Sequence, residues 1–113
     1  MAAAAVDLAH LARYTGGDVA LNAEVLRLFD SQASELVERL QSIIDARDAQ
    51  SWRTITHTLK GAARGIGAFG LGDAAAAAEP IDPSDSKTAS AALAVLQHKT
   101  HDVRFFIQSY LAA

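Results

Sequence analysis

Apolar side chains recur every three or four positions across residues 19–46. On a helix that turns by about 100° per residue, this spacing places them along one stripe. The residues of the stripe are Leu21, Val25, Leu28, Phe29, Leu36, Leu40, Ile43 and Ile44. β-Branched and aromatic residues are sparse, and alanine supplies much of the apolar content. The pattern therefore predicts closely packed helices and argues against a sheet.

The rest of the chain extends this helical pattern. We predict helices over residues 6–14, 19–46, 49–66 and 71–79, and a last one that runs to about residue 111. Asp18 and Asp48 are candidate N-caps. Pro80 ends the fourth helix, and Asp82 as N-cap followed by Pro83 looks like the start of the last one. The fold class that follows is all-α, an antiparallel up-down four-helix bundle with a short additional N-terminal helix. A single domain is expected over residues 1–113.

His57 lies on the polar side of the predicted helix 49–66. The apolar stripe of this helix consists of Trp52, Ile55, Leu59, Ala62, Ala63 and Ile66. His57 projects on nearly the opposite side at this spacing. It shares its face with Arg53, Lys60, Gly61 and Arg64. We therefore expect the imidazole to face water.

Gly61 lies one helical turn after His57, directly beside it on the helix surface. A glycine within a helix costs about 1 kcal/mol relative to alanine. The missing side chain leaves space in which a large partner can approach the imidazole. The neighbouring cations disfavour a protonated imidazole and favour an anion on its nitrogen, such as a phosphoryl group. These residues indicate a nucleophilic histidine presented to a macromolecular phosphoryl donor.

The sequence His57-Thr58-Leu59-Lys60-Gly61, followed by Ile66-Gly67-Ala68, resembles the signature of histidine-containing phosphotransfer (HPt) domains. In that family the histidine is phosphorylated, and the signature continues with a lysine, a small residue and a closing glycine. The resemblance assigns these positions to His57, Lys60, Gly61 and Gly67. One HPt module is about as long as this whole chain.

The resemblance also implies a mechanism and partners. Nε2 of His57 would accept a phosphoryl group from a receiver domain of a hybrid histidine kinase and pass it to the receiver Asp of a response regulator. Lys60 would stabilise the phosphate. The receiver would supply Mg²⁺, so we expect no cofactor of the protein's own and no independent kinase activity. We assign partner contacts to Arg53, Gly61, Arg64 and Ala68, although Arg64 occupies a variable position of the family.

Two other interpretations of the exposed histidine stay open. A histidine kinase dimerisation domain also presents a histidine on a helical hairpin. It usually has an acidic residue directly after the histidine and a proline five residues after it, where this chain has Thr58 and Ala62. A non-catalytic helical scaffold is the second alternative, but it would leave the arrangement of His57, Lys60 and Gly61 unexplained.

The remaining histidines are interpreted as surface residues. His98 and His101 are three residues apart, a spacing at which two imidazoles can share a metal, but no E-x-x-H pattern accompanies them. His10 lies in the first predicted helix. No G-x-S-x-G motif indicates a hydrolase. We therefore predict no metal site in this chain.

Charge and composition limit the other functions. The net charge of −3 argues against nucleic acid as the main partner. The chain has no cysteine, which excludes disulfides and thiol chemistry. No apolar run approaches the roughly 20 residues that span a bilayer, and residues 1–5 lack the basic region of a signal peptide. We expect a cytoplasmic monomer that does not associate with a membrane.

Overall fold

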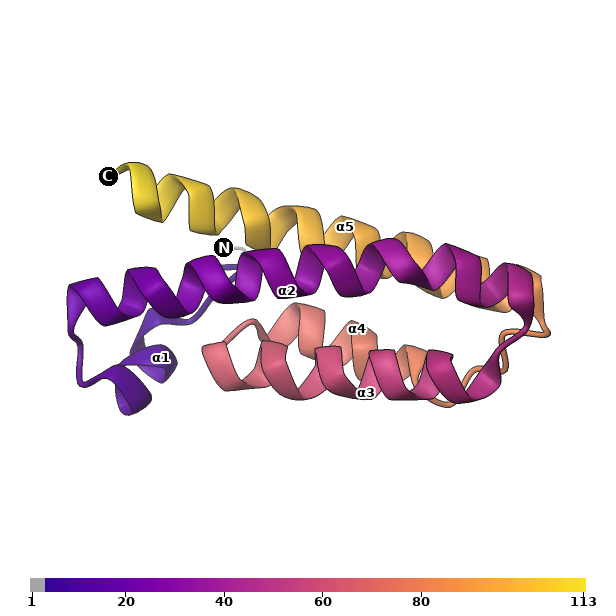
Figure 1. Ribbon diagram of the computed structural model, residues 1–113. Coiled ribbons are helices and arrows are strands. Elements are labelled where there is room, and N and C mark those ends of the chain that lie inside the picture. The colour runs from indigo at the N-terminus through magenta and orange to yellow at the C-terminus, as the bar shows by residue number, and fades with distance from the viewer. Residues whose placement is uncertain (1–3) are drawn as a thin grey trace.

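The computed structural model describes residues 4–113, which form five α-helices (Figure 1). They are α1 (Leu8–Thr15), α2 (Val19–Ala46), α3 (Ala49–Ile66), α4 (Phe69–Ala78) and α5 (Ser86–Ala112). Within this range there is no strand. Residues 1–3, which belong to the predicted domain and to the stretch in which we predict no signal peptide, lie outside the described residues. The all-α prediction is confirmed.

The helices α2 to α5 form a bundle in which α2 and α4 each pack against both α3 and α5. Figure 1 shows α2 beside α5, with α3 and α4 together below them. Successive helices are joined by short connections and run in opposite directions. α1 contacts α2 and α3 at the end of the bundle where α2 begins. This confirms the predicted antiparallel four-helix bundle with a short N-terminal helix.

Trp52 fastens the start of α3 to the end of α4. Its side chain is fully buried, and its Nε1 donates a hydrogen bond of 2.9 Å to the carbonyl oxygen of Ala78. Ala63, Ala75 and Ala78 are also buried, and their small side chains let α3 and α4 approach closely. This contact brings the residue after Ala78 beside the middle of α3.

Local capping sets the limits of α2 and α3. Asp18 accepts a hydrogen bond from the backbone N–H of Leu21, and Asp48 accepts one from that of Ser51. Both therefore act as the predicted N-caps, because each satisfies a backbone donor that the first helical turn leaves free. Both helices span their predicted residues, 19–46 and 49–66.

The starts of the other helices differ from the prediction. α5 begins at Ser86, with Asp85 as its N-cap, whereas Asp82 accepts hydrogen bonds from Ser84 in the preceding turn. The prediction that Asp82 caps this helix is wrong, because Asp82-Pro83 suits a turn as well as a helix start. α1 covers Leu8–Thr15 instead of residues 6–14, and α4 covers Phe69–Ala78 instead of residues 71–79.

The buried stripe of α2 is also shifted around the helix from the predicted one. Leu21 and Leu28 are exposed, at 40% and 66%. The buried positions of the helix are Asn22, Leu26, Phe29, Ala33, Val37, Leu40, Ile43 and Ile44. One side of α2 packs against α3 and α5. Apolar residues outside that side, such as Leu21 and Leu28, remain exposed to solvent. None of the helices in the described part of the chain is long and apolar enough to cross a membrane.

Gly67 joins the N-terminal segment to the turn between α3 and α4. It ends α3 in the left-handed conformation, with φ at 88°. Its carbonyl oxygen accepts a hydrogen bond of 2.9 Å from the backbone N–H of Asp7. A Cβ atom at this position would lie 2.6 Å from the carbonyl oxygen of Asp7. Glycine is therefore needed here both for the backbone conformation and for the close approach of Asp7.

Candidate functional site

His57 projects from the middle of α3 into solvent, as its predicted face requires. Its side chain is 66% exposed. Its neighbours Ile55, Thr56 and Leu59 are buried and hold this part of α3 against the bundle. The burial of Thr56 was not predicted, and it is possible because the hydroxyl donates to the carbonyl oxygen of Trp52 within the helix. The imidazole is thus mounted on a rigid element and leaves one side open.

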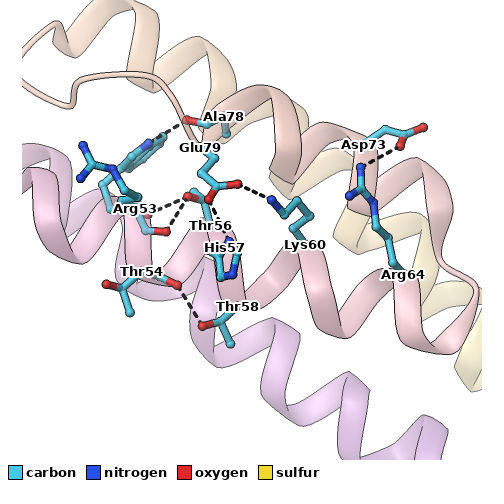
Figure 2. A network of polar contacts seen from close by, with 11 residues as sticks. Arg53, Thr54, Thr56, His57, Thr58, Lys60, Arg64, Asp73, Ala78 and Glu79 are labelled. Carbon is cyan, nitrogen blue, oxygen red and sulfur yellow. Dashed lines mark hydrogen bonds and ion pairs between the residues drawn. The ribbon is translucent and has the colours of Figure 1, made fainter.

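Glu79, the residue that ends α4, links the imidazole of His57 to the ammonium group of Lys60 (Figure 2). Its Oε1 lies 2.8 Å from Nδ1 of His57, and its Oε2 accepts a hydrogen bond of 2.6 Å from Nζ of Lys60. The side chains of Lys60 and Glu79 are largely buried, at 22% and 23% exposure. One carboxylate therefore contacts both of the predicted functional side chains.

The contact with Glu79 determines which ring nitrogen of His57 is free. An ionised carboxylate only accepts hydrogen bonds, so Nδ1 must carry the proton that it donates. In the neutral imidazole the lone pair is then on Nε2. The geometry agrees with the expectation that Nε2 is the reactive atom, and it gives the physical reason.

The charges around His57 differ from the sequence prediction in one respect. We predicted that cations on its own face surround the imidazole, but its nearest ionised neighbour is the acid Glu79. The hydrogen bond from Lys60, and secondarily the one from His57, lowers the pKa of the Glu79 carboxyl below its usual value. The carboxylate therefore stays ionised and neutralises Lys60 in the unliganded protein. The hydrogen bond to Glu79 therefore decides which nitrogen of the neutral ring carries the lone pair.

Gly61 is exposed and leaves open space beside His57. A Cβ atom built at this position would meet no other atom within 4 Å. Gly61 is therefore not required for a contact between helices, and its absent side chain opens only the solvent side of α3. This is the arrangement that the approach of a large partner would need.

The other predicted partner residues separate into two groups. Arg53 and Arg64 are exposed on α3, and Arg64 lies 3.7 Å from Asp73 of α4. Ala68 is fully buried at the junction of α3 and α4. The prediction that Ala68 contacts a partner is wrong, because the turn after Gly67 folds its side chain into the core.

Sequence reasoning assigned no site role to Glu79, although a signal for it exists. His57 lies ten residues before Gly67, and Glu79 lies eleven residues after Ala68. In two antiparallel helices joined by a tight turn, residues at equal distances from the turn lie opposite each other. Counting outward from Gly67 and Ala68 would have placed Glu79 within one residue of the position opposite His57.

The histidines outside the site make few contacts. Nε2 of His98 lies 3.6 Å from Asp102 on the same face of α5. In α1 the ring of His10 packs edge-on against Tyr14 and Phe69. Among residues 4–113, no three potential ligands from histidine, cysteine, aspartate or glutamate gather at one point. Within this range, His98 and His101 therefore have no third potential metal ligand beside them.

Comparison with known families assigns the protein to a class. The model of the Hpt domain family matches residues 24–104, which include α3, α4 and most of α2 and α5. The chain belongs to the Hpt domain family, whose members carry out histidine phosphotransfer in phosphorelays and interact with receiver domains of two-component systems. No curated protein and no solved structure matches the chain.

Proposed function

We propose that Nε2 of His57 accepts a phosphoryl group from the aspartyl phosphate of one receiver domain and passes it to the Asp of another. The observation that carries this proposal is the hydrogen bond between Nδ1 and Glu79 on an otherwise exposed imidazole. In the neutral ring it leaves the lone pair on Nε2, the nitrogen that Glu79 does not contact. The open space at Gly61 admits the donor.

The transfer is a displacement at phosphorus. The Nε2 lone pair forms the new nitrogen–phosphorus bond while the bond to the aspartyl oxygen breaks, and the receiver carboxylate departs with that electron pair. The ring keeps its proton on Nδ1 and acquires a positive charge. Glu79 lies 2.8 Å from Nδ1 and stabilises this charge as it develops. The second transfer runs through the same steps in reverse, to a different Asp.

Lys60 stabilises the phosphoryl group in this proposal. Its ammonium group has three donors, of which one is used by Glu79 at 2.6 Å. A phosphoryl group on His57, one turn away on α3, offers anionic oxygens to the others. Phosphoryl transfer depends mainly on positioning and charge neutralisation. The receiver would supply Mg²⁺ for the part of the charge that Lys60 does not reach.

The proposed partners are a receiver domain of a hybrid histidine kinase as donor and one of a response regulator as acceptor. The protein would act as a monomer, since its hydrophobic core is buried within one bundle, and its proposed location is the cytoplasm. A scaffold without phosphotransfer would require neither the exposed imidazole nor its acidic partner.

The deciding experiment is incubation with receiver domains that carry labelled aspartyl phosphate, prepared with labelled acetyl phosphate and Mg²⁺. We expect transfer of an acid-labile label to the wild type and to His98→Gln, a matched control because His98 is also an exposed helical histidine. His57→Gln should keep its helical circular dichroism and accept no label. Acid-stable label, or full transfer to His57→Gln, would contradict the proposal.

A further inference from the structure

Arg64 lies on the same face of α3 as His57, seven residues further along the helix. Seven residues correspond to about two turns, or about 10 Å along the axis. Its side chain is 47% exposed. A protein that covers His57 would therefore also cover the guanidinium group of Arg64.

The stem of Arg64 lies across α4 at Gly72. A Cβ atom at Gly72 would come within 2.8 Å of Cγ of Arg64 and 3.5 Å of its Nε. The space that a side chain at position 72 would fill is thus occupied by the arginine stem. Gly72, which lies inside helix α4, permits the conformation in which Arg64 reaches over that helix.

The ion pair between Arg64 and its acidic partner is long and exposed to solvent. Nη2 of Arg64 lies 3.7 Å from Oδ1 of Asp73, whose side chain is 79% exposed. The ion pair of Lys60 and Glu79 differs in both respects, with a distance of 2.6 Å and exposures of 22% and 23%. A solvent-exposed ion pair contributes little to stability, so the guanidinium group can exchange one carboxylate for another at small cost. Figure 2 shows the two ion pairs side by side along α3 and α4.

We propose that Arg64 is a specificity-determining residue that recognises an acidic side chain on the receiver, and that Asp73 is its competitor within the protein. On docking, Arg64 leaves Asp73 for a carboxylate of the receiver that lies about 10 Å from the phosphorylated Asp, as Arg64 lies from His57 along α3. Receivers with an acid at that place are preferred over those without one. This proposal rests on the proposed function of His57.

The test compares substitutions of Arg64 and Asp73, which should change the affinity for the receiver in opposite directions. Transfer from an acetyl phosphate-labelled receiver is measured as a function of receiver concentration. Arg64→Ala should raise the half-saturating concentration by about two- to fivefold, the range of an exposed ion pair, and leave the saturated rate unchanged. Asp73→Asn should lower it by a similar factor. A purely structural ion pair predicts instead that both substitutions act in the same direction.

A second pair of variants tests the position of Arg64 without changing any charge. Gly72→Ala should displace the arginine stem and raise the half-saturating concentration as Arg64→Ala does. Gly70→Ala is the matched control on the same helix, because a Cβ atom there lies 4.0 Å from the nearest side-chain atom, Cδ of Lys99. It should leave the concentration unchanged. Melting temperatures establish that each variant is folded.

The salt dependence gives a further readout. An interfacial ion pair steers association, so the half-saturating concentration of the wild type should rise with salt more steeply than that of Arg64→Ala. Equal slopes, or no effect of Arg64→Ala while His57 is still labelled, would overturn this proposal and leave the function of His57 intact. Failure to label His57 in the wild type would overturn both.

Discussion

Glu79 holds the side chains of His57 and Lys60, the candidate functional residues of α3, in place with its two carboxylate oxygens. At the scale of single residues it therefore combines three effects. It fixes the tautomer of the neutral His57 ring and it neutralises Lys60, and in the proposed mechanism it would compensate the charge of the ring during transfer. A single acid on a neighbouring helix thus determines the chemistry of a histidine that is itself exposed.

The first prediction concerns the substitution Glu79→Gln. A hydrogen bond to a charged group is worth about 1.5–3 kcal/mol, so transfer to His57 should slow by about ten- to a hundredfold. The saturated rate should fall more than receiver affinity, because Glu79 acts on the developing charge and not on docking. Transfer is measured by single-turnover kinetics with a labelled receiver. An unchanged saturated rate would mean that Glu79 only ties α4 to α3.

A second prediction follows from the pKa of Glu79, which lies below the ordinary value of 4.5 mainly because of the hydrogen bond from Lys60. A carboxyl whose pKa is lowered in the folded state stabilises the fold above its ordinary pKa. This contribution is lost as the pH falls through the folded-state pKa. The free energy of unfolding should therefore fall below about pH 4.5 more steeply in the wild type than in Glu79→Gln.

The comparison is made by urea unfolding of both proteins over the same pH range. Asp48 and Asp82 also have lowered pKa values, through hydrogen bonds from Ser51 and Ser84. Both proteins contain these acids, so only the difference between the two curves reports on Glu79. Parallel curves would show that the ion pair does not contribute to stability.

At the scale of elements, α3 combines a buried stripe that fixes its position with an exposed stripe that carries the site. Trp52 secures the helix on the buried side through Ala78, which is the residue before Glu79. The packing of α3 on α4 is thus what delivers the acid to His57. On the exposed side, Gly61 weakens the helix locally without any packing benefit.

A third prediction separates access from packing at Gly61. Because nothing lies within 4 Å of a Cβ atom there, Gly61→Ala should stabilise the protein by up to about 1 kcal/mol. Gly61→Leu should melt no lower than the wild type and should block transfer from receivers. Gly65→Leu is the comparison variant, since position 65 is equally open but lies a turn further from His57, and it should weaken transfer less than Gly61→Leu. Stability and transfer lost together in Gly61→Leu would contradict the open face.

At the scale of the whole molecule, the bundle closes its seams and α1 covers one end. The principal extents are 43 × 28 × 21 Å, so the end with Gly67 is well separated from the middle of α3. Val6 and Leu11 are buried there, and Asp7 is hydrogen-bonded to Gly67. The contacts at this end of the molecule stabilise the fold. They lie about 15 Å along α3 from His57, where the proposed reaction takes place.

The fourth prediction uses this separation. Gly67→Ala places a side chain at a φ of 88° and within 2.6 Å of the Asp7 carbonyl oxygen, so it should destabilise the protein by about 1–3 kcal/mol. The folded fraction should still accept phosphate at His57 at the wild-type saturated rate. Denaturant unfolding and single-turnover transfer below the melting temperature measure the two effects. A normal melting temperature would contradict the role of Gly67 as the anchor of the N-terminal segment.

Local interactions made several features predictable from the sequence. The limits of α2 and α3 depend on the side chains of Asp18 and Asp48, which act within one turn of the chain. The exposure of His57 follows from the helical period of α3. Tertiary structure alone decided the burial of Ala68 and the exposure of Leu28, and it decided that Glu79, among the residues near the position opposite His57, contacts the imidazole. Each of these depends on how closely and at which angle two helices pack, and interatomic contacts between distant segments, not local periodicity, determine that packing.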